Sequence, residues 1–323
     1  MIDQNSVVEI INTSLPVLIT SAATSPVLIK LLDTIENVVK TLYLPRLVFK
    51  KEKAKVDVEL YRKQKENELF ENQTFTLYEI TKLKNFLNAS EYAAEELQKS
   101  ENQQSDENIG FDWIMRFFDA VGNVSNKDLQ KLWGKVLAGE MQQPGTCSLR
   151  TMEVIRNMSQ KEAEIYNKLC KYVVRSGNSY FIFNSGFSGL DCYNQDSHNY
   201  ILKTGLNYSD SIIPMIESGL LSVDNSLGTD FKTNSVLNIQ NQEVSCFIIA
   251  DETKENFLSI EPYFLTTSGV ELYNIIQGMS GFKSDVNYPI LCFKELKMQH
   301  PELIVSAHKI IGEDNFEPDD LLL

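Results

Sequence analysis

Apolar residues in the segment before Pro144 follow the spacing of an amphipathic helix. They stand at i, i+3, i+4, i+7 and i+8, so they form one stripe along a helix. The members of this stripe are Leu129, Leu132, Trp133, Val136 and Leu137. Ser125 and Asp128 have the spacing of a capping box, and Pro144-Gly145 supplies a stop and a turn. The pattern therefore predicts a helix that begins at Ser125 and ends before Pro144.

Two features of this predicted helix concern its packing. Gly134 and Ala138 are small residues one turn apart, which would let another backbone come close. Glu140 continues the apolar stripe, and a carboxylate buried there needs a partner because an unpaired buried charge is costly. Arg150 begins the next helix after the Pro-Gly turn. We expect Glu140 and Arg150 to form a buried structural pair, and the alternative is a catalytic pair.

Two further helices are predicted after this turn. Ser148 is placed to cap the first of them. The apolar residues of that short helix are Leu149, Met152 and Ile155. Ser159 and Glu162 form a second capping box, which predicts the start of the next helix.

Residues 46–99 are rich in charge and contain neither proline nor glycine, which is typical of a long helix. Apolar residues recur there at spacings that predict a helix-packing seam. The seam consists of Ala54, Val58, Tyr61, Leu69, Leu77, Ile80, Leu83, Leu87, Ala94 and Leu97. One helix of this length would run on the order of 80 Å, which is too long for a single globule to bury. We therefore expect a self-associating stalk or an antiparallel hairpin, with a second copy of the chain as a partner through residues 46–99.

An apolar stretch with small residues occupies positions 15–32. Pro16, Pro26 and Lys30 interrupt it, so its apolar runs fall short of the roughly 20 residues that a membrane span needs. We expect a helical hairpin packed in an oligomer. The alternative is a membrane-active segment, because an apolar stretch and the basic run at residues 50–55 together suit anionic lipid.

Beyond Val174 the sequence becomes rich in serine, asparagine, glycine and aromatic residues, which favour strands and loops. Strands are predicted at residues 180–183, 235–239, 244–250 and 263–266. A helix is predicted within residues 205–221 and ends at Gly219, and Ser268 opens a later helix. A helix, a hairpin and then a further strand and helix in this order look like a winged-helix domain.

The predicted fold class is α+β and predominantly α-helical. It combines long N-terminal helices, a central helical module and a C-terminal winged-helix-like α/β domain. The predicted divisions are an apolar helical segment (1–45), a long helix or helical hairpin (46–104), a helical core module (105–175), the winged-helix-like domain (176–290) and a C-terminal helix with an acidic tail (291–323).

Charge argues against a nucleic-acid partner. The formal net charge is −14 and the isoelectric point is about 4.8. Between Tyr200 and Ile290 four bases face eleven acids, and the helix expected to act as a recognition helix has no lysine or arginine over residues 210–218. DNA binding draws much of its affinity from phosphate neutralisation. A winged helix that contacts protein is therefore preferred to a DNA-binding regulator, which remains an alternative.

Motifs that carry catalysis or metal binding are scarce. The five cysteines are dispersed without C-x-x-C spacing, which suits thiols in a reducing cytoplasm and gives neither a zinc nor a disulfide framework. No P-loop, dinucleotide-binding or zinc-protease pattern occurs, and residues 185–189 miss the G-x-S-x-G spacing of a hydrolase nucleophile. His198 near Cys192 is read as a surface residue, and Glu252-x-Lys254 is only a faint nuclease-like pattern. We predict no catalytic, metal or cofactor-binding residues and no cofactor.

A set of residues in the central module resembles a bacterial family of domains of unknown function. The set comprises Trp113, Ser125, Gln130, Trp133, Glu140, Pro144, Gly145, Ser148, Arg150 and Thr151. The similarity covers roughly residues 39–276 and is strongest over residues 112–169. It implies a bacterial protein that is mainly helical on its N-terminal side and has no assigned activity. The family is similar in general character to the abortive-infection alpha proteins. This resemblance alone implies a role in phage defence.

The sequence therefore supports a non-enzymatic, oligomeric protein of phage defence or stress response that works through protein contacts. Its N-terminus lacks the basic region of a secretory signal, so we expect it in the cytoplasm. The alternative from another functional class is an effector that damages its host's membrane through residues 15–32.

Overall fold

The structure is a computed structural model. It describes residues 25–39, 41–42, 77–99, 107–187, 195–223, 228–231, 236–249, 256–259, 262–278, 281–301, 303–312 and 315–316. The predicted basic run at 50–55, the seam residues from Ala54 to Leu69 and most of the acidic tail lie outside these ranges. The chain divides into two compact units, Met1–Arg156 and Asn157–Leu323. The boundary falls inside the range 105–175 that the sequence analysis treats as one module.

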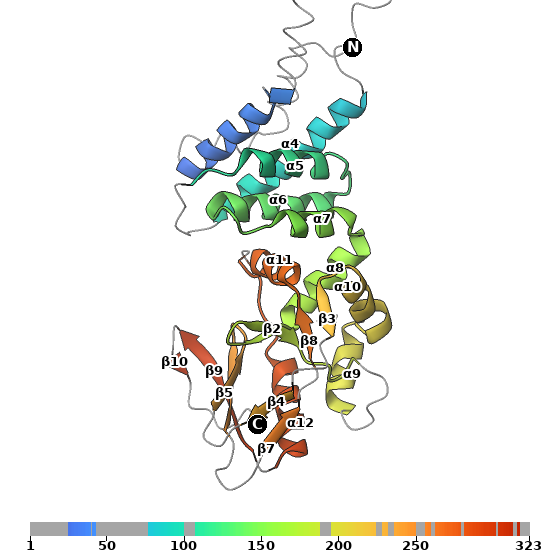
Figure 1. Cartoon of the computed structure of the whole chain (residues 1–323), viewed down its shortest axis with the longest axis vertical. Helices are drawn as coiled ribbons and strands as arrows, with labels where there is room; N and C mark the ends of the chain where they lie inside the picture. The colour runs from blue at the N-terminus through green and yellow to red at the C-terminus, as the bar shows by residue number, and fades with distance from the viewer. Residues whose placement is uncertain are drawn as a thin grey trace, which may run out of the picture. The chain divides into compact units, whose positions relative to one another are not determined.

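The N-terminal unit is helical (Figure 1). Its labelled helices are α4 (Leu77–Lys99), α5 (Phe111–Val121), α6 (Lys127–Gln142) and α7 (Leu149–Asn157). An earlier helix covers residues 26–39 and buries Val27, Leu28 and Leu31. Residues 26–32 of the predicted apolar stretch at 15–32 are therefore part of a packed helix, and residues 15–24 lie outside the described ranges.

Aromatic side chains form the centre of this unit. Phe117 contacts Phe86 edge-on with ring centroids 6.2 Å apart, and it meets the Trp133 ring at 5.5 Å. Trp113 stacks on Phe117 at 5.4 Å. Such pairs add directional contacts to the burial of large apolar surfaces. Both tryptophans are thus core residues that join α5 to α6.

The close approach predicted at Gly134 is present between α4 and α6. A Cβ atom built on Gly134 would lie 2.5 Å from Tyr92 Cβ, 2.9 Å from the Ala89 carbonyl oxygen and 3.0 Å from the Ala93 nitrogen. Two of these atoms belong to the α4 backbone, which cannot move aside as a side chain could. The prediction that a small residue here admits another backbone is confirmed.

The predicted start of α6 is wrong by one residue. Asn126, not Ser125, is the N-cap, and its Oδ1 accepts from the Asp128 amide at 2.9 Å and the Leu129 amide at 3.1 Å. Asparagine and serine have similar preferences for the N-cap position, so propensity does not distinguish Asn126 from the neighbouring Ser125. Ser125 itself is exposed. The second predicted capping box, Ser159 with Glu162, is confirmed.

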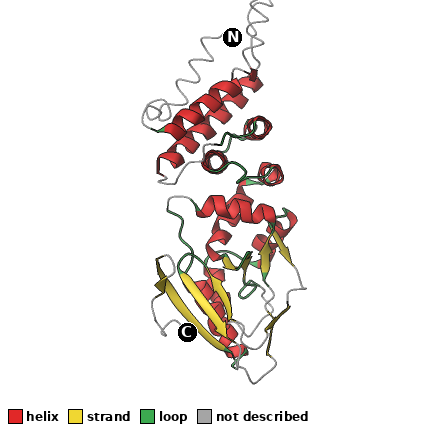
Figure 2. Ribbon diagram, turned by 60° about the vertical axis from the view of Figure 1, so that its left-hand side comes forward, coloured by secondary structure: helices red, strands yellow, loops and turns green. Residues whose placement is uncertain are grey.

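The C-terminal unit combines helices with antiparallel strands (Figures 1 and 2). Its helical elements are α8 (Gln160–Leu169), the 3₁₀ turn η2 (Cys170–Tyr172), α9 (Gln195–Lys203), the π-helical turn η3 (Tyr208–Ile212), α10 (Ile213–Glu217), α11 (Thr267–Gln277) and α12 (Asn287–Gln299). Its strands are β1 (Val174–Ser176), β2 (Ser179–Ile182), β3 (Leu221–Val223), β4 (Gly228–Phe231), β5 (Val236–Gln240), β6 (Val244–Ile249), β7 (Asn256–Ser259), β8 (Tyr263–Leu265), β9 (Ile304–Gly312) and β10 (Asn315–Phe316). The α+β class is confirmed.

The main sheet has the strand order β10-β9-β6-β5-β1-β2-β8-β3, and β4 pairs with β7 separately. The predicted hairpin is β5 and β6, with Gln240 opposite Ser245. Asn241 fixes its turn, because Asn241 Oδ1 accepts from the amides of Glu243 and Val244 at 2.9 Å. β3 follows α10 and pairs with β8. The winged-helix-like order of elements is thus embedded in a wider antiparallel sheet.

Gly219 ends α10 as predicted. Its φ is +77°, and the Leu220 amide donates to the Met215 carbonyl at 2.9 Å while the Gly219 amide donates to Ile216 at 3.0 Å. These two bonds form a Schellman motif. Thr266 Oγ1 donates to the Gly219 carbonyl at 2.6 Å and accepts from the Gly269 amide at 3.1 Å. Thr266, not Ser268, is therefore the N-cap of α11. Its hydroxyl contacts both the first turn of α11 and the residue that ends α10.

We predict that Gly134→Ala destabilises the N-terminal unit although alanine is the better helix former. The added methyl group would press on the α4 backbone, and overpacking of this kind costs about 1–3 kcal/mol. Gly110→Ala is the control, because nothing lies within 4 Å of a Cβ at that position. Thermal unfolding should show a clearly lower Tm for Gly134→Ala and a smaller loss, below about 1 kcal/mol, for Gly110→Ala, which replaces only a glycine N-cap of α5 by alanine. Equal effects of the two substitutions would contradict a tight crossing at Gly134.

Candidate functional site

Two residues of the predicted family pattern, Glu140 and Trp113, bind the turn that follows α6, which contains Pro144 and Gly145 of the same pattern. Glu140 is 3% exposed, and its two carboxylate oxygens accept from the Gly145 amide at 2.8 Å and the Cys147 amide at 3.0 Å. Gly145 has φ +89°, a conformation that L side chains rarely adopt. Pro144 is half-buried beside it. The carboxylate therefore holds the Pro-Gly turn closed against the end of α6.

Trp113 binds the same turn from α5. Its indole Nε1 donates to the Cys147 carbonyl at 2.7 Å. The Cys147 amide and carbonyl thus bind Glu140 and Trp113 respectively. An indole N–H that enters a core needs an acceptor, and the turn provides it. The turn is therefore attached to two helices by polar groups that are themselves buried.

Gln130 forms a second buried polar group, between α4 and the start of α6. Its Nε2 donates to Asn85 Oδ1 at 3.1 Å and to the Val124 carbonyl at 2.8 Å. Asn85 Nδ2 in turn donates to the Gly122 carbonyl at 2.8 Å. These bonds satisfy the loop between α5 and α6, whose backbone would otherwise be buried without partners.

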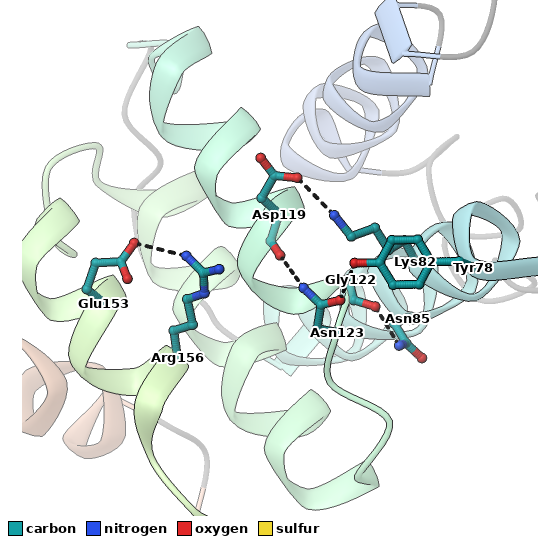
Figure 3. A network of polar contacts seen from close by, with 8 residues as sticks. All are labelled: Tyr78, Lys82, Asn85, Asp119, Gly122, Asn123, Glu153 and Arg156. Atoms are coloured by element: carbon teal, nitrogen blue, oxygen red, sulfur yellow. Dashed lines mark hydrogen bonds and ion pairs between the residues drawn. The ribbon is translucent and has the colours of Figure 1, made fainter.

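Figure 3 shows where Asn85 and Gly122 lie relative to surface contacts of the same helices. Lys82 Nζ lies 3.2 Å from Asp119 Oδ1, and the Tyr78 hydroxyl donates to Asn123 Oδ1 at 2.9 Å. On α7, Arg156 lies 3.5 Å from Glu153. These are exposed pairs of the kind that contribute little to stability.

The predicted Glu140–Arg150 pair is wrong. Arg150 is exposed on α7, whereas Glu140 is buried and oriented toward backbone amides. The prediction recognised that Glu140 needs a partner but assumed that only a charged side chain could serve. Ser148 takes the predicted role of cap, because its Oγ accepts from the Thr151 amide at 3.2 Å. Thr151 is fully buried, and its hydroxyl lies 3.1 Å from Ser148 Oγ.

A second polar cluster, which the sequence did not suggest, lies inside the C-terminal unit. It consists of Ser185 after β2, Ser197 on α9 and Glu295 on α12, all buried. Ser185 Oγ donates to Glu295 Oε2 and lies 2.8 Å from Ser197 Oγ. Residues 110 positions apart thus meet. No local spacing could have signalled this cluster, which we call the serine–glutamate cluster.

Tyr288 and Cys292 lie on α12, the same helix as Glu295. The Tyr288 hydroxyl donates to the carbonyls of Phe183 and Ser185 at 2.8 and 2.7 Å. Burial raises the pKa of Tyr288 and of Cys292 well above their usual values, and the nearby charge of Glu295 adds to both shifts. A thiol with a raised pKa stays protonated at neutral pH and is a poor nucleophile. Burial likewise raises the pKa of the Cys170 and Cys246 thiols.

Within the described ranges, the serine–glutamate cluster shows no contact between a serine and a histidine of the kind that a hydrolytic triad needs. His198 Nδ1 lies 3.0 Å from the Gly186 carbonyl oxygen, so that ring nitrogen is directed at the backbone rather than at Ser185. Among the described residues, no group of three or more His, Cys, Asp or Glu could hold a metal ion. Glu252 and Lys254 of the nuclease-like pattern lie outside the described ranges.

Residues 73–285 match a family described as a protein of unknown function, DUF2806, and this range covers well over half of the sequence. The chain belongs to the DUF2806 family. The expected resemblance to a family of unknown function is thereby confirmed. Searches of curated proteins and of solved structures found no match. The DUF2806 match includes all ten residues of the predicted pattern as well as Ser185 and Ser197, whereas Glu295 lies beyond it.

In the described part of this DUF2806 protein, no helix is long and apolar enough to cross a membrane.

We predict that Glu140→Ala lowers the free energy of unfolding by about 3 kcal/mol. The substitution removes two charge-assisted hydrogen bonds and leaves the Cys147 amide buried without its acceptor. Glu140→Gln keeps one acceptor and should cost about half as much. Arg150→Ala should change stability by no more than about 0.5 kcal/mol, because Arg150 is exposed. Urea unfolding of the three variants measures these differences, and an Arg150→Ala cost equal to that of Glu140→Ala would restore the ion-pair hypothesis.

Proposed function

We propose that this DUF2806 protein is a non-enzymatic, oligomeric component of bacterial phage defence or stress response, and that it acts through protein–protein contacts. The observation that carries the proposal is the use made of the family-pattern side chains. Glu140, Gln130 and Trp113 direct their polar groups at backbone atoms of their own unit. Side chains that bind the backbone of a turn and a loop stabilise the fold of their unit. We infer that such a unit acts as a scaffold, which binds other proteins through its surface.

Part of the predicted seam has a role inside the chain. Ile80, Leu83, Leu87, Ala94 and Leu97 are buried within the N-terminal unit. Leu77, at the first position of α4, is 81% exposed, and the neighbouring Tyr78 is 60% exposed. Large apolar side chains exposed next to each other favour an interaction surface. We therefore assign self-association to the beginning of α4 rather than to its whole length.

The alternative of a membrane-damaging effector has weaker support. Within residues 15–32 it needs apolar side chains that can enter lipid, and Val27, Leu28 and Leu31 are buried. A lipid-facing role would require the helix at 26–39 to leave its unit and expose them.

The alternative of a DNA-binding regulator is also less well supported. α10 has five residues without lysine or arginine, and the π-helical turn before it is likewise without a base. Phosphate contacts would have to come from another surface. The acidic balance of the unit instead suits a partner with basic or mixed charge.

The defence role rests on the resemblance in style to abortive-infection alpha proteins. Its test is a phage challenge of bacteria that express the chain from a plasmid. A defence protein should lower the plating efficiency of at least one phage, and Glu140→Ala, which opens the turn, should remove the protection. Unchanged plating over a broad phage panel would contradict the defence role and leave the assembly claim to be tested separately.

We predict that the full chain runs as an oligomer in light scattering and that Leu77→Asp shifts it toward the 36.8 kDa monomer. Aspartate is tolerated at the start of a helix, because it suits the helix dipole, so the fold should persist. Met298→Asp is the control, since Met298 is 71% exposed but belongs to the C-terminal unit. A monomeric wild-type chain at micromolar concentration would refute self-association, and equal dissociation by both variants would refute the assigned surface.

A further inference from the structure

Glu295 is a buried acid with half of its hydrogen-bonding capacity unused. The residue is 5% exposed. One oxygen, Oε2, accepts from Ser185 Oγ. The other, Oε1, has no hydrogen-bond partner among the residues that the structure describes. A carboxylate removed from water ordinarily has several donors or a cation, because its desolvation costs several kcal/mol.

Among the described residues, no base forms an ion pair with Glu295. Lys294 and Lys297 share α12 with Glu295, but both are exposed. The stretch 188–194, which separates Ser185 from α9 in the sequence, contains no lysine, arginine or histidine. The nearest neighbours on α12 are the neutral Tyr288 and Cys292, whose pKa values burial raises.

The backbone holds the two serines close to this carboxylate. Ser185 lies in a turn closed by the Phe187 amide, which donates to the Asn184 carbonyl at 3.1 Å. Gly186, with φ +83°, presses against α9: a Cβ there would lie 2.7 Å from the Ser197 carbonyl carbon and oxygen. The hydroxyls of Ser185 and Ser197 are consequently fixed 2.8 Å apart without any side chain between them. Three oxygen-bearing groups from three segments therefore converge on one buried point.

We propose that the serine–glutamate cluster binds a monovalent alkali cation, with Glu295, Ser185 and Ser197 as its oxygen ligands. Carboxylate and hydroxyl oxygens are hard donors, which suit hard cations and disfavour soft metals. One carboxylate balances a single positive charge, whereas a divalent ion would leave an excess charge in an apolar surrounding. The ion would join α9 and α12 through the turn after β2. The inference is independent of the proposed function.

The test compares the full chain in sodium, potassium and tetramethylammonium chloride at one ionic strength. Tetramethylammonium is too large for the cluster, so the wild-type Tm should be higher in one of the alkali salts by roughly 3 °C. Glu295→Gln should abolish this difference, and Ser197→Ala should reduce it. Glu217→Gln is the matched control, because Glu217 is an exposed glutamate of the same unit, and it should keep the full difference.

Direct binding is followed by the line width of the sodium-23 resonance, which should broaden with the wild-type chain and not with Glu295→Gln. If Glu295→Gln fails to fold, Ser197→Ala and the wild-type line width decide the question. Equal Tm values in the three salts without line broadening would overturn the proposal. A cation-dependent Tm that persists in Glu295→Gln would overturn it as well, by locating the salt effect elsewhere.

Discussion

The N-terminal unit depends on how closely the backbones of α4 and α6 approach at Gly134. The position of a Cβ there would lie 2.9 Å from the Ala89 carbonyl oxygen, a distance that real Cβ atoms essentially never show. This approach places Trp133, the residue before Gly134, against Phe117, and allows Gln130 to reach Asn85 on α4. A wider crossing would separate these partners and leave buried amide groups unsatisfied, so one missing side chain supports both the aromatic core and its polar contacts.

The two buried glutamates Glu140 and Glu295, one in each unit, differ in the hydrogen-bond donors that their carboxylates receive. Glu140 receives two backbone amides from a turn seven or fewer residues away, so its charge is satisfied locally. Glu295 receives one serine hydroxyl from a residue far along the chain, and its second oxygen lacks a donor in the described part of the unit. The first arrangement is complete as a structural device. In the second, one carboxylate oxygen has no donor within the described ranges, and the cation proposal is based on this difference.

These arrangements bear on what a DUF2806 protein can do. Within the predicted pattern, Glu140, Gln130 and the two tryptophans are engaged in a turn, a loop and an aromatic core. Leu77, which is exposed, and Glu295, one oxygen of which has no donor among the described residues, do not belong to that pattern, although its members Ser125 and Arg150 are exposed as well. The surface proposed for self-association and the proposed cation site therefore lie outside the predicted family pattern.

The sequence by itself determined the features that depend on neighbours along the chain. The apolar stripe of α6, the Ser159–Glu162 capping box, the glycine that ends α10, the β5–β6 hairpin and the need for a small residue at Gly134 all follow from local spacing and backbone chemistry. The choice of Asn126 over Ser125 as the cap is also local, but the two residues are near equals, so their propensity could not decide it.

Only the tertiary structure decided which groups meet across long separations. It gave Glu140 two backbone amides in place of Arg150, buried the seam residues of α4 other than Leu77 within their own unit, and brought Ser185 and Ser197 to Glu295. The physical reason is that a buried polar group requires a partner without specifying which one. Backbone amides carry no sequence signal, and residues on different elements have no fixed spacing, so the partner is chosen by the packing of the whole unit.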